Sequence, residues 1–404
     1  MKILQLAPRI PFPEDDGGKI SIANITKVLH KLGDEVTLVF YDSAPELLSI
    51  PEYAYEYAEM FPIKHNTTNT LVRIANSFIR QKSIYIEKHI SSYVKATMAA
   101  FLKGRQYDII HCDHTAMLPL GLFCKSILGC PLSLRLHNLE YKIWNRYADS
   151  MSPISPSGIF LRNQANLLKD YEAKALKLAD ISIAITDVDR DAALKLTPEA
   201  NIIAVSAGVD PKEFLPDPNV QRDASELIHA TVYSWRHNLS AIKWFIDEVF
   251  PLLDGKVEDY HLNLLGKSAP NWLSSYHPKV RVLGYVPKIQ PYLNKAGIYI
   301  APLFVGSGIR IKILEAMAMG LPTVASPISA EGINASEKDG LFIANSAEAF
   351  ATYISNLIAD NDFRINSGKS ARNYILNNYD WNTNVALIRN YYQSLIDNTK
   401  RKNL

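Results

Sequence analysis

The feature that most constrains the fold is an alternation of short apolar runs with longer amphipathic stretches. In the first half of the chain, runs rich in β-branched residues occupy residues 2–8, 35–42, 107–114, 132–138 and 180–186. Stretches with helical spacing of apolar residues lie between them, for example at 20–33. Near-continuous apolar strands separated by helices are typical of a parallel sheet that is covered on both faces.

The same alternation restarts after residue 200. Strand candidates lie at 201–208, 228–234, 260–266, 280–286, 297–303 and 321–327, and helix candidates at 241–253, 309–319 and 347–357. The pattern predicts the α/β class, with two doubly wound, Rossmann-like domains in tandem. We expect the domains at 1–205 and 206–380, followed by a C-terminal helix at 381–404 that crosses back to the first domain and whose order ends near Thr399.

Length and composition agree with two domains and exclude some functions. A chain of 404 residues suggests two domains or three. The net charge of +2 and the lack of a basic run interleaved with aromatic residues argue against nucleic acid as a partner. Cys112, Cys124 and Cys130 are odd in number and lack metal-ligand spacing, so we expect reduced core thiols. We therefore expect a cytoplasmic protein, or one peripheral on the inner membrane face.

Residues 64–105 form a basic segment in which Glu87 alone opposes the positive charges. The basic residues are Lys64, Arg73, Arg80, Lys82, Lys88, Lys95, Lys103 and Arg105. Apolar residues are interleaved with them, and a basic amphipathic stretch can lie on an anionic bilayer. Two interpretations stay open: a peripheral membrane contact, or a helical insertion with a solvated basic face.

The segment 305–326 carries the clearest chemistry. A predicted strand at 297–303 leads into "FVGSG", and a predicted helix follows from 309. Gly306 and Gly308 let a ligand approach the backbone, and the N–H groups of such a helix start favour an anion. Arg310 and Lys312 in the first turn would cost ~0.3–1 kcal/mol each without a bound anion. Glu315 is suited to hold the vicinal hydroxyls of a ribose. On these residues alone, a plain glycine turn before a basic helix remains the alternative.

The same segment also resembles a known family. "GSGIRIKILEAMAMGLPTVASPISAEGI" is similar to the donor-site signature of the retaining GT-B glycosyltransferases of family 4. "PRIPFPEDDGGKI", "RLHNLEY", "SAGVDPKEF" and "VRVLGYVPKIQPYLNKAGIYIAPL" resemble further segments of that family, in the same order along most of the chain. The resemblance implies a GT-B fold, in which two Rossmann-like domains face each other across a cleft.

The resemblance also implies roles for residues of the second domain. Glu315 matches the second glutamate of the family's Glu-x7-Glu pair, which grips the ribose. Ser307 occupies the position of the first glutamate, which is a departure that leaves the identity of the sugar open. Arg236 is what remains of an Arg and Lys pair that binds the diphosphate in the family, so Arg310 and Lys312 are expected to take over that role.

In the first domain, the resemblance implies that His137 contacts the donor sugar at the end of a strand. Gly17 and Gly18 precede a helix, and we expect them to let the backbone approach the diphosphate or the acceptor. His111 and His114 flank another strand end, where we expect polar side chains at the edge of the strand rather than ligands.

The function implied is retaining, metal-independent transfer of a sugar from a nucleoside-diphosphate sugar, UDP- or GDP-linked, in the hexosyltransferase class. The acceptor is expected to be a glycan or a lipid-linked glycan of a surface polysaccharide. We expect neither a cofactor nor a metal, because "DVDRD" (187–191) is better explained as the capped start of a helix. Two alternatives stay open: a non-catalytic GT-B scaffold, and a UDP-sugar epimerase.

Overall fold

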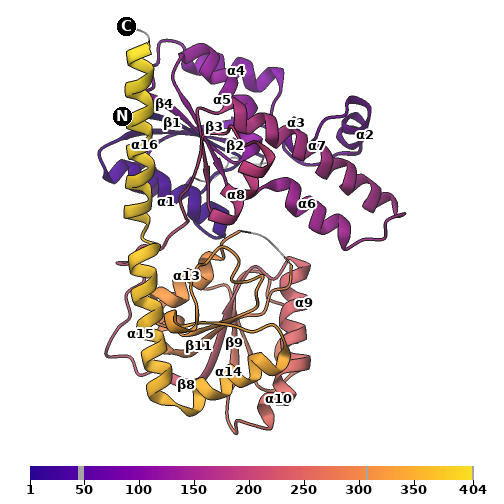
Figure 1. The fold of residues 1–404 in the computed structure, drawn as a ribbon, viewed down its shortest axis with the longest axis vertical. Coiled ribbons are helices and arrows are strands. Elements are labelled where there is room, and N and C mark those ends of the chain that lie inside the picture. Colours follow the sequence, from indigo (N-terminus) through magenta and orange to yellow (C-terminus); the bar gives the residue numbers. More distant parts are fainter. Residues whose placement is uncertain (44–49, 306–307, 403–404) are drawn as a thin grey trace. The chain divides into compact units, whose positions relative to one another are not determined.

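A computed structural model describes residues 1–43, 50–305 and 308–402 of the protein. The chain divides into two compact units (Figure 1). Unit 1 comprises Met1–Ser206 and Trp381–Leu404, and unit 2 comprises Ala207–Asp380. None of the helices in the described part of the chain is long and apolar enough to cross a membrane.

Unit 1 contains a parallel sheet in the order β3-β2-β1-β4-β5-β6-β7. Its strands are β1 (Lys2–Ala7), β2 (Glu35–Asp42), β3 (Glu59–Lys64), β4 (Ile109–Asp113), β5 (Leu132–Leu136), β6 (Ile181–Ala184) and β7 (Ile202–Ala204). The strand order reverses beside β1, so the carboxyl ends of β1 and β4 flank the point where doubly wound sheets bind ligands.

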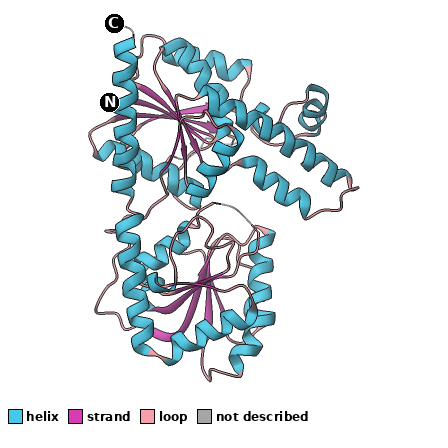
Figure 2. Cartoon of the chain, in the orientation of Figure 1, coloured by secondary structure: helices cyan, strands magenta, loops and turns pink. Residues whose placement is uncertain are grey.

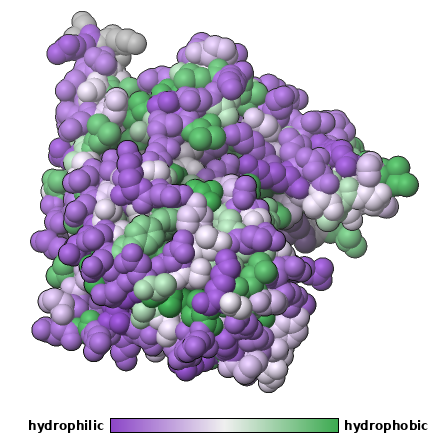
Figure 3. Space-filling view, turned by 60° about the horizontal axis from the view of Figure 1, so that its bottom comes forward, coloured by the Kyte–Doolittle hydropathy of each residue, from purple (hydrophilic) through white to green (hydrophobic). Residues whose placement is uncertain are grey.

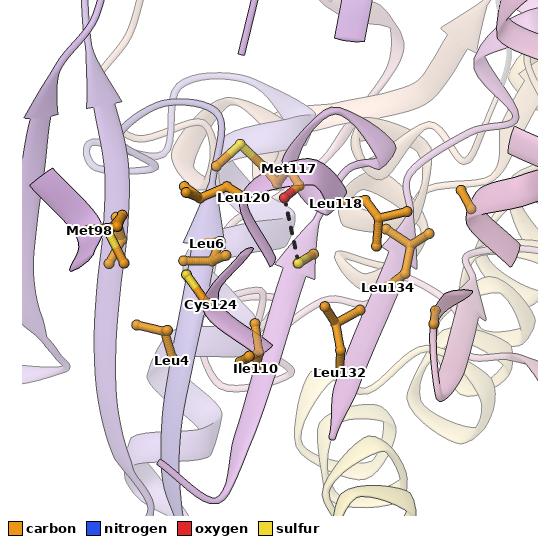
Figure 4. Close-up of a cluster of buried hydrophobic side chains, with 14 of the residues drawn as sticks. Leu4, Leu6, Met98, Ile110, Met117, Leu118, Leu120, Cys124, Leu132 and Leu134 are labelled. Carbon is orange, nitrogen blue, oxygen red and sulfur yellow. Dashed lines mark hydrogen bonds between the residues drawn. The ribbon is translucent and has the colours of Figure 1, made fainter. Parts of the chain in front are cut away.

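Helices cover both faces of this sheet (Figure 2). The helices of unit 1 are α1 (Gly17–Lys31), α2 (Leu71–Arg80), α3 (Ile84–Glu87), α4 (Ser92–Leu102), α5 (Leu118–Leu128), α6 (Glu140–Asp149), α7 (Pro156–Leu178), α8 (Asp187–Leu196) and α16 (Trp381–Lys402). On one face, Met98 of α4 and Cys124 of α5 pack with Leu6, Ile110 and Leu132 of the strands (Figure 4). Removing these apolar side chains from water is the main stabilising contribution to the unit.

The last helix, α16, packs against α1 in unit 1. Arg389 donates to the Asp34 carboxylate at 2.8 and 3.0 Å. The buried hydroxyl of Tyr392 forms a hydrogen bond with the ring of His111 in β4. The end of the chain therefore completes the same unit as its beginning.

Unit 2 contains a second parallel sheet, in the order β10-β9-β8-β11-β12-β13. Its strands are β8 (Asp223–Ala230), β9 (His261–Leu265), β10 (Val280–Gly284), β11 (Ala296–Ala301), β12 (Thr323–Ala325) and β13 (Leu341–Ile343). Its helices are α9 (Arg236–Trp244), the π-helical turn η3 (Phe245–Val249), α10 (Phe250–Asp254), α11 (Trp272–Tyr276), α12 (Gln290–Lys295), α13 (Ile311–Ala318), α14 (Ala347–Ala359) and α15 (Asn361–Asn378). Separate apolar clusters form around Phe245 and Phe350 and around Leu314 and Ile375.

The two sheets confirm the predicted α/β architecture, and four details differ from the sequence-based expectations. The run at 201–208 belongs to β7, the edge strand of the first sheet, rather than to a second repeat. Strands β3 and β13 were not anticipated, because one contains Pro62 between charged ends and the other has only three residues.

The other two differences concern helix ends. Arg310 lies at the N-cap of α13 with extended backbone angles (φ −86°, ψ 93°), so it precedes the helix instead of occupying its first turn. The final helix was expected to lose order beyond Thr399, yet α16 continues to Lys402. Helical hydrogen bonds thus persist along its polar end.

Candidate active site

The glycine turn of unit 2 connects the carboxyl end of β11 to α13, as the sequence predicts for an anion-binding unit. Gly308 has a φ of +78°, a backbone conformation that favours glycine. Gly306 and Ser307 lie outside the described residues. The backbone before the turn is held at Leu303, whose N–H donates to Ser329 Oγ at 2.9 Å and whose carbonyl accepts from Ser326.

Behind the turn, Lys312 and Glu315 form an ion pair within α13. Lys312 Nζ lies 2.8 Å from Glu315 Oε2, and the two residues are three positions apart. The Glu315 side chain is almost fully buried, whereas that of Lys312 is 36% exposed. The Lys312 side chain is therefore partly open to solvent, whereas the Glu315 side chain is enclosed by the protein.

The start of α9 carries further candidate residues, and this helix follows β8, the neighbour of β11 in the sheet. Arg236 is the first residue of α9 and is exposed. Burial lowers the pKa of His237, and the positive charge of nearby Arg310 lowers it further. The structure thus brings Arg310 near His237, a residue not predicted from the sequence although it directly follows Arg236.

In unit 1, His137 follows β5 and is buried beside an acidic group. Its Nε2 lies 3.2 Å from Asp113 Oδ1 at the end of β4 and 3.2 Å from Arg135 Nη1. Burial lowers the pKa of His137 to about 4, although the hydrogen bond with Asp113 acts in the opposite direction. The imidazole is therefore neutral near pH 7, and it can form hydrogen bonds but carries no proton to donate as an imidazolium.

Asp113 is the centre of a fully buried polar cluster. Its Oδ2 accepts from Gln5 Nε2 at 2.8 Å and lies 3.4 Å from His111 Nε2, while its Oδ1 lies 3.6 Å from Arg135 Nη1. Burial alone would raise the pKa of this carboxyl, but His111 and His137, through their hydrogen bonds and the charge they carry when protonated at low pH, hold it well below its usual range. Asp113 is thus a carboxylate compensated by its neighbours.

His111 and His114 were expected to be polar side chains at the edge of a strand, and that expectation is wrong for His111, which lies within β4, whereas His114 does follow the strand. His111 is fully buried and bonded to Tyr392. The His114 ring stacks on the His137 ring, with centroids 3.8 Å apart, and its backbone has a φ of 72°. Burial and the nearby His137 lower the pKa of His114 well below its usual value. The two rings form one neutral aromatic surface.

Gly17 and Gly18 begin α1, after the loop that follows β1. Asp16 caps this helix by accepting from Lys19 N–H at 3.0 Å, and its Oδ1 also pairs with Arg9 at 2.8 Å. A Cβ atom on Gly18 would lie 3.3 Å from that carboxylate oxygen. The missing side chain therefore leaves room for the Arg9–Asp16 pair, and the approach of a ligand here stays a prediction.

Within the described part of the chain, one group of side chains has the chemistry of a metal site. Ligand atoms of Asp223, Glu226 and His261 lie within 4.8 Å of one another. They belong to the amino-terminal ends of β8 and β9, at the edge of the sheet opposite to the glycine turn. The acidic run at 187–191 is the start of α8, where Thr186 caps the helix, as predicted.

Comparison of the fold with solved structures identifies the class of protein. Sucrose-phosphate synthase from Thermosynechococcus elongatus is similar with a TM-score of 0.74 and 16% identity, over 98% of this chain and 99% of that one. HepE of Anabaena, solved in complex with UDP and glucose, is similar with a TM-score of 0.67 and 14% identity, over 98% and 100% of the two chains. These likenesses show the GT-B fold.

The sequence then places the chain within that class. The model described as Glycosyltransferase Family 4 matches residues 16–213, and the model described as Glycosyl transferases group 1 matches residues 227–360. The chain belongs to this glycosyltransferase family. An uncharacterized glycosyltransferase of Methanocaldococcus jannaschii is 28% identical over 179 residues, which cover 41% of this chain and 44% of that relative.

Proposed function

We propose that the chain is a retaining, metal-independent glycosyltransferase that uses a UDP- or GDP-linked sugar. Its acceptor would be a growing glycan or a lipid-linked glycan of a surface polysaccharide, glycosylated in the cytoplasm or at the inner face of the membrane. The observation that carries the proposal is the glycine turn of unit 2, where Gly308, Arg310 and the Lys312–Glu315 pair follow β11. A relative of the same fold, HepE, was solved with UDP and glucose, which supports a nucleotide-sugar donor.

The chemistry of glycosyl transfer explains why such a turn is useful. The transition state resembles an oxocarbenium ion, and negative charge develops on the β-phosphate of the leaving nucleotide. Cations and N–H groups fixed around that phosphate stabilise the charge by several kcal/mol, roughly. We assign this role to Arg310, Lys312 and the N–H groups at the start of α13, with Arg236 as a further contact. Glu315 would hold the ribose hydroxyls.

For His137 we keep the role that the family resemblance implies, which is contact with the transferred sugar. A histidine with a pKa of about 4 is neutral at the working pH. It is therefore suited to position the sugar by a hydrogen bond and is not a general acid. Arg310 and Glu315 would act on the donor, and His137 on the sugar that is transferred.

The proposal is tested by thermal stabilisation and hydrolysis with UDP-, GDP- and dTDP-sugars. A donor at 100 times its dissociation constant should add about 2.7 kcal/mol to the stability. Glu315→Gln and Arg310→Gln should abolish that gain while the fold remains. Glu258→Gln and Arg281→Gln, on exposed residues of the same unit, should retain it.

Other outcomes would favour the alternatives. Binding of a nucleotide sugar without hydrolysis or transfer to any acceptor would favour the scaffold. Formation of an epimeric UDP-sugar without an acceptor would favour the epimerase. Binding that survives in both the Glu315 and the Arg310 variants would remove the assigned donor site.

A further inference from the structure

The part of unit 1 formed by α2 and the α6–α7 hairpin projects from the sheet (Figure 1) and exposes large apolar side chains. In α2, Leu71 is 85% exposed, Val72 70% and Ile79 79%. At the tip of the hairpin, Ile154 is 86% exposed, and Met151 is also exposed. Hydrophobic residues, coloured green, are visible at the end of this projection (Figure 3). Single exposed apolar residues are ordinary, but a cluster on adjoining elements marks an interaction surface.

Contacts within the projection keep these side chains outward. Phe78 of α2 packs on Phe160 of α7, with ring centroids 5.4 Å apart. Gln164 of α7 donates to Ser77 Oγ at 3.2 Å and accepts from Ile84 N–H at 2.9 Å. Because α2 binds α7 through Ser77 and Phe78, its opposite face, with Val72 and Ile79, is left to solvent. The apolar surface is therefore built into the fold.

Exposed cations lie beside the apolar face of α2. Residues 64–105 contain eight basic residues and one acidic residue. Within the described residues, ion pairs join Lys64 to Asp42, Lys82 to Glu87 and Arg105 to Glu59. The segment keeps a net positive charge, and Arg80 and Lys82, at the end of α2, are exposed. An apolar face next to exposed cations complements an anionic lipid bilayer, where acyl chains lie beneath negative headgroups.

We infer that α2 and the tip of the α6–α7 hairpin form a docking surface for an anionic membrane. Leu71, Val72, Ile79 and Ile154 enter the boundary between headgroups and acyl chains, and Arg80 binds lipid phosphates. This goes beyond the basic segment identified from the sequence, because the hairpin tip lies outside 64–105. It also needs no particular donor sugar, so it does not depend on the proposed reaction.

The test is flotation of the full chain with phosphatidylcholine vesicles, with and without phosphatidylglycerol. We expect binding to the anionic vesicles that weakens with added salt. The triple variant Leu71→Ser, Val72→Ser, Ile79→Ser should reduce binding more than tenfold, since binding scales with buried apolar area (~0.8 kcal/mol per CH₂). Arg80→Gln should reduce it about fivefold, from ~1 kcal/mol per cation near the surface.

Matched controls lie in unit 2. Leu215→Ser removes a 63%-exposed leucine, and Lys338→Gln removes an exposed cation; both should leave flotation unchanged. The substituted side chains are exposed, so folding should be retained, which circular dichroism checks. Absence of flotation, equal binding to neutral vesicles, or unchanged binding of the triple variant would overturn the inference. A dimer of the parent chain that becomes a monomer in the triple variant would also overturn it, in favour of self-association.

Discussion

In unit 2 the candidate residues come mainly from one continuous segment, whereas in unit 1 they are collected from distant parts of the chain. Gly308, Arg310, Lys312 and Glu315 lie within eight residues of one another. The cluster around Asp113, which includes His137, collects residues from β1, β4 and β5, and Tyr392 of α16 joins it through His111, 281 positions away. One site is local in sequence, and the other exists only after the sheet has formed.

The two regions also differ in burial, and burial decides what their charges do. Asp113 and Arg135 are fully buried, and each depends on its neighbours to compensate its charge. Lys312 is 36% exposed and can exchange its carboxylate partner for water or a ligand. Buried pairs are strongly destabilising when one partner is removed, while exposed pairs contribute little. Substitutions in the Asp113 cluster of unit 1 should therefore lower the stability of the fold, whereas substitutions of the unit 2 cations should mainly lower the affinity for a ligand.

The largest expected effect follows from Asp113→Asn. The substitution keeps the shape of the side chain but leaves the buried guanidinium of Arg135 without its compensating charge. We expect a loss of about 3–5 kcal/mol in the free energy of unfolding of unit 1. Urea unfolding followed by the fluorescence of Trp144 and Trp381, with the other tryptophans replaced by phenylalanine, measures it. Asp187→Asn, on an exposed residue, is the control. A loss below about 1 kcal/mol for Asp113→Asn would contradict the idea that the buried cluster of unit 1 supports folding.

A pH-dependent effect should follow from Glu172 of α7, which accepts from the N–H groups of Glu140 and Tyr141 at 2.9 and 3.1 Å. Burial raises the pKa of Glu172 to about 8 and that of Glu140 to about 7. The unfolded chain releases these protons near pH 4.3, roughly. Between that pH and about 8, the unfolded state is ionised while the folded carboxyl of Glu172 keeps its proton. Stability is thus lost as the pH rises through this window.

Glu172→Gln removes that titration. Comparing the free energies of unfolding of the parent chain and the variant at each pH should therefore isolate the contribution of Glu172. The parent chain should lose up to about 1.4 kcal/mol per pH unit relative to the variant as the pH rises from 5 to 7, roughly. Contributions from the buried histidines are common to both proteins and cancel. Urea unfolding at several pH values measures the difference, and a difference that stays constant with pH would show that Glu172 titrates normally.

Features that depend on residues close together in the sequence could be predicted from the sequence alone. The alternation of apolar runs predicts both sheets, and the spacing from Gly308 to Glu315 predicts a turn that leads into a helix. The Asp113 cluster depends instead on strand pairing, because Asp113 and Arg135 are direct partners in the register of β4 and β5. No local pattern marks such a pair. His237 could have been predicted as a candidate residue, since it directly follows Arg236 after β8.

The smallest expected effect on stability follows from Lys312→Gln. Its ion pair with Glu315 is a helical pair at i,i+3 between a partly exposed ammonium and a nearly buried carboxylate. Because the glutamine amide can still donate to that carboxylate, the loss should cost at most about 1 kcal/mol. Lys243→Gln is a matched control, because Lys243 forms an exposed pair with Asp247 at 2.7 Å in the same unit. Both variants should unfold like the parent chain in urea, yet only Lys312→Gln should weaken stabilisation by the nucleotide sugar. A loss above about 2 kcal/mol for Lys312→Gln would mean that the pair supports the fold of unit 2, and the contrast between the two units would then fail.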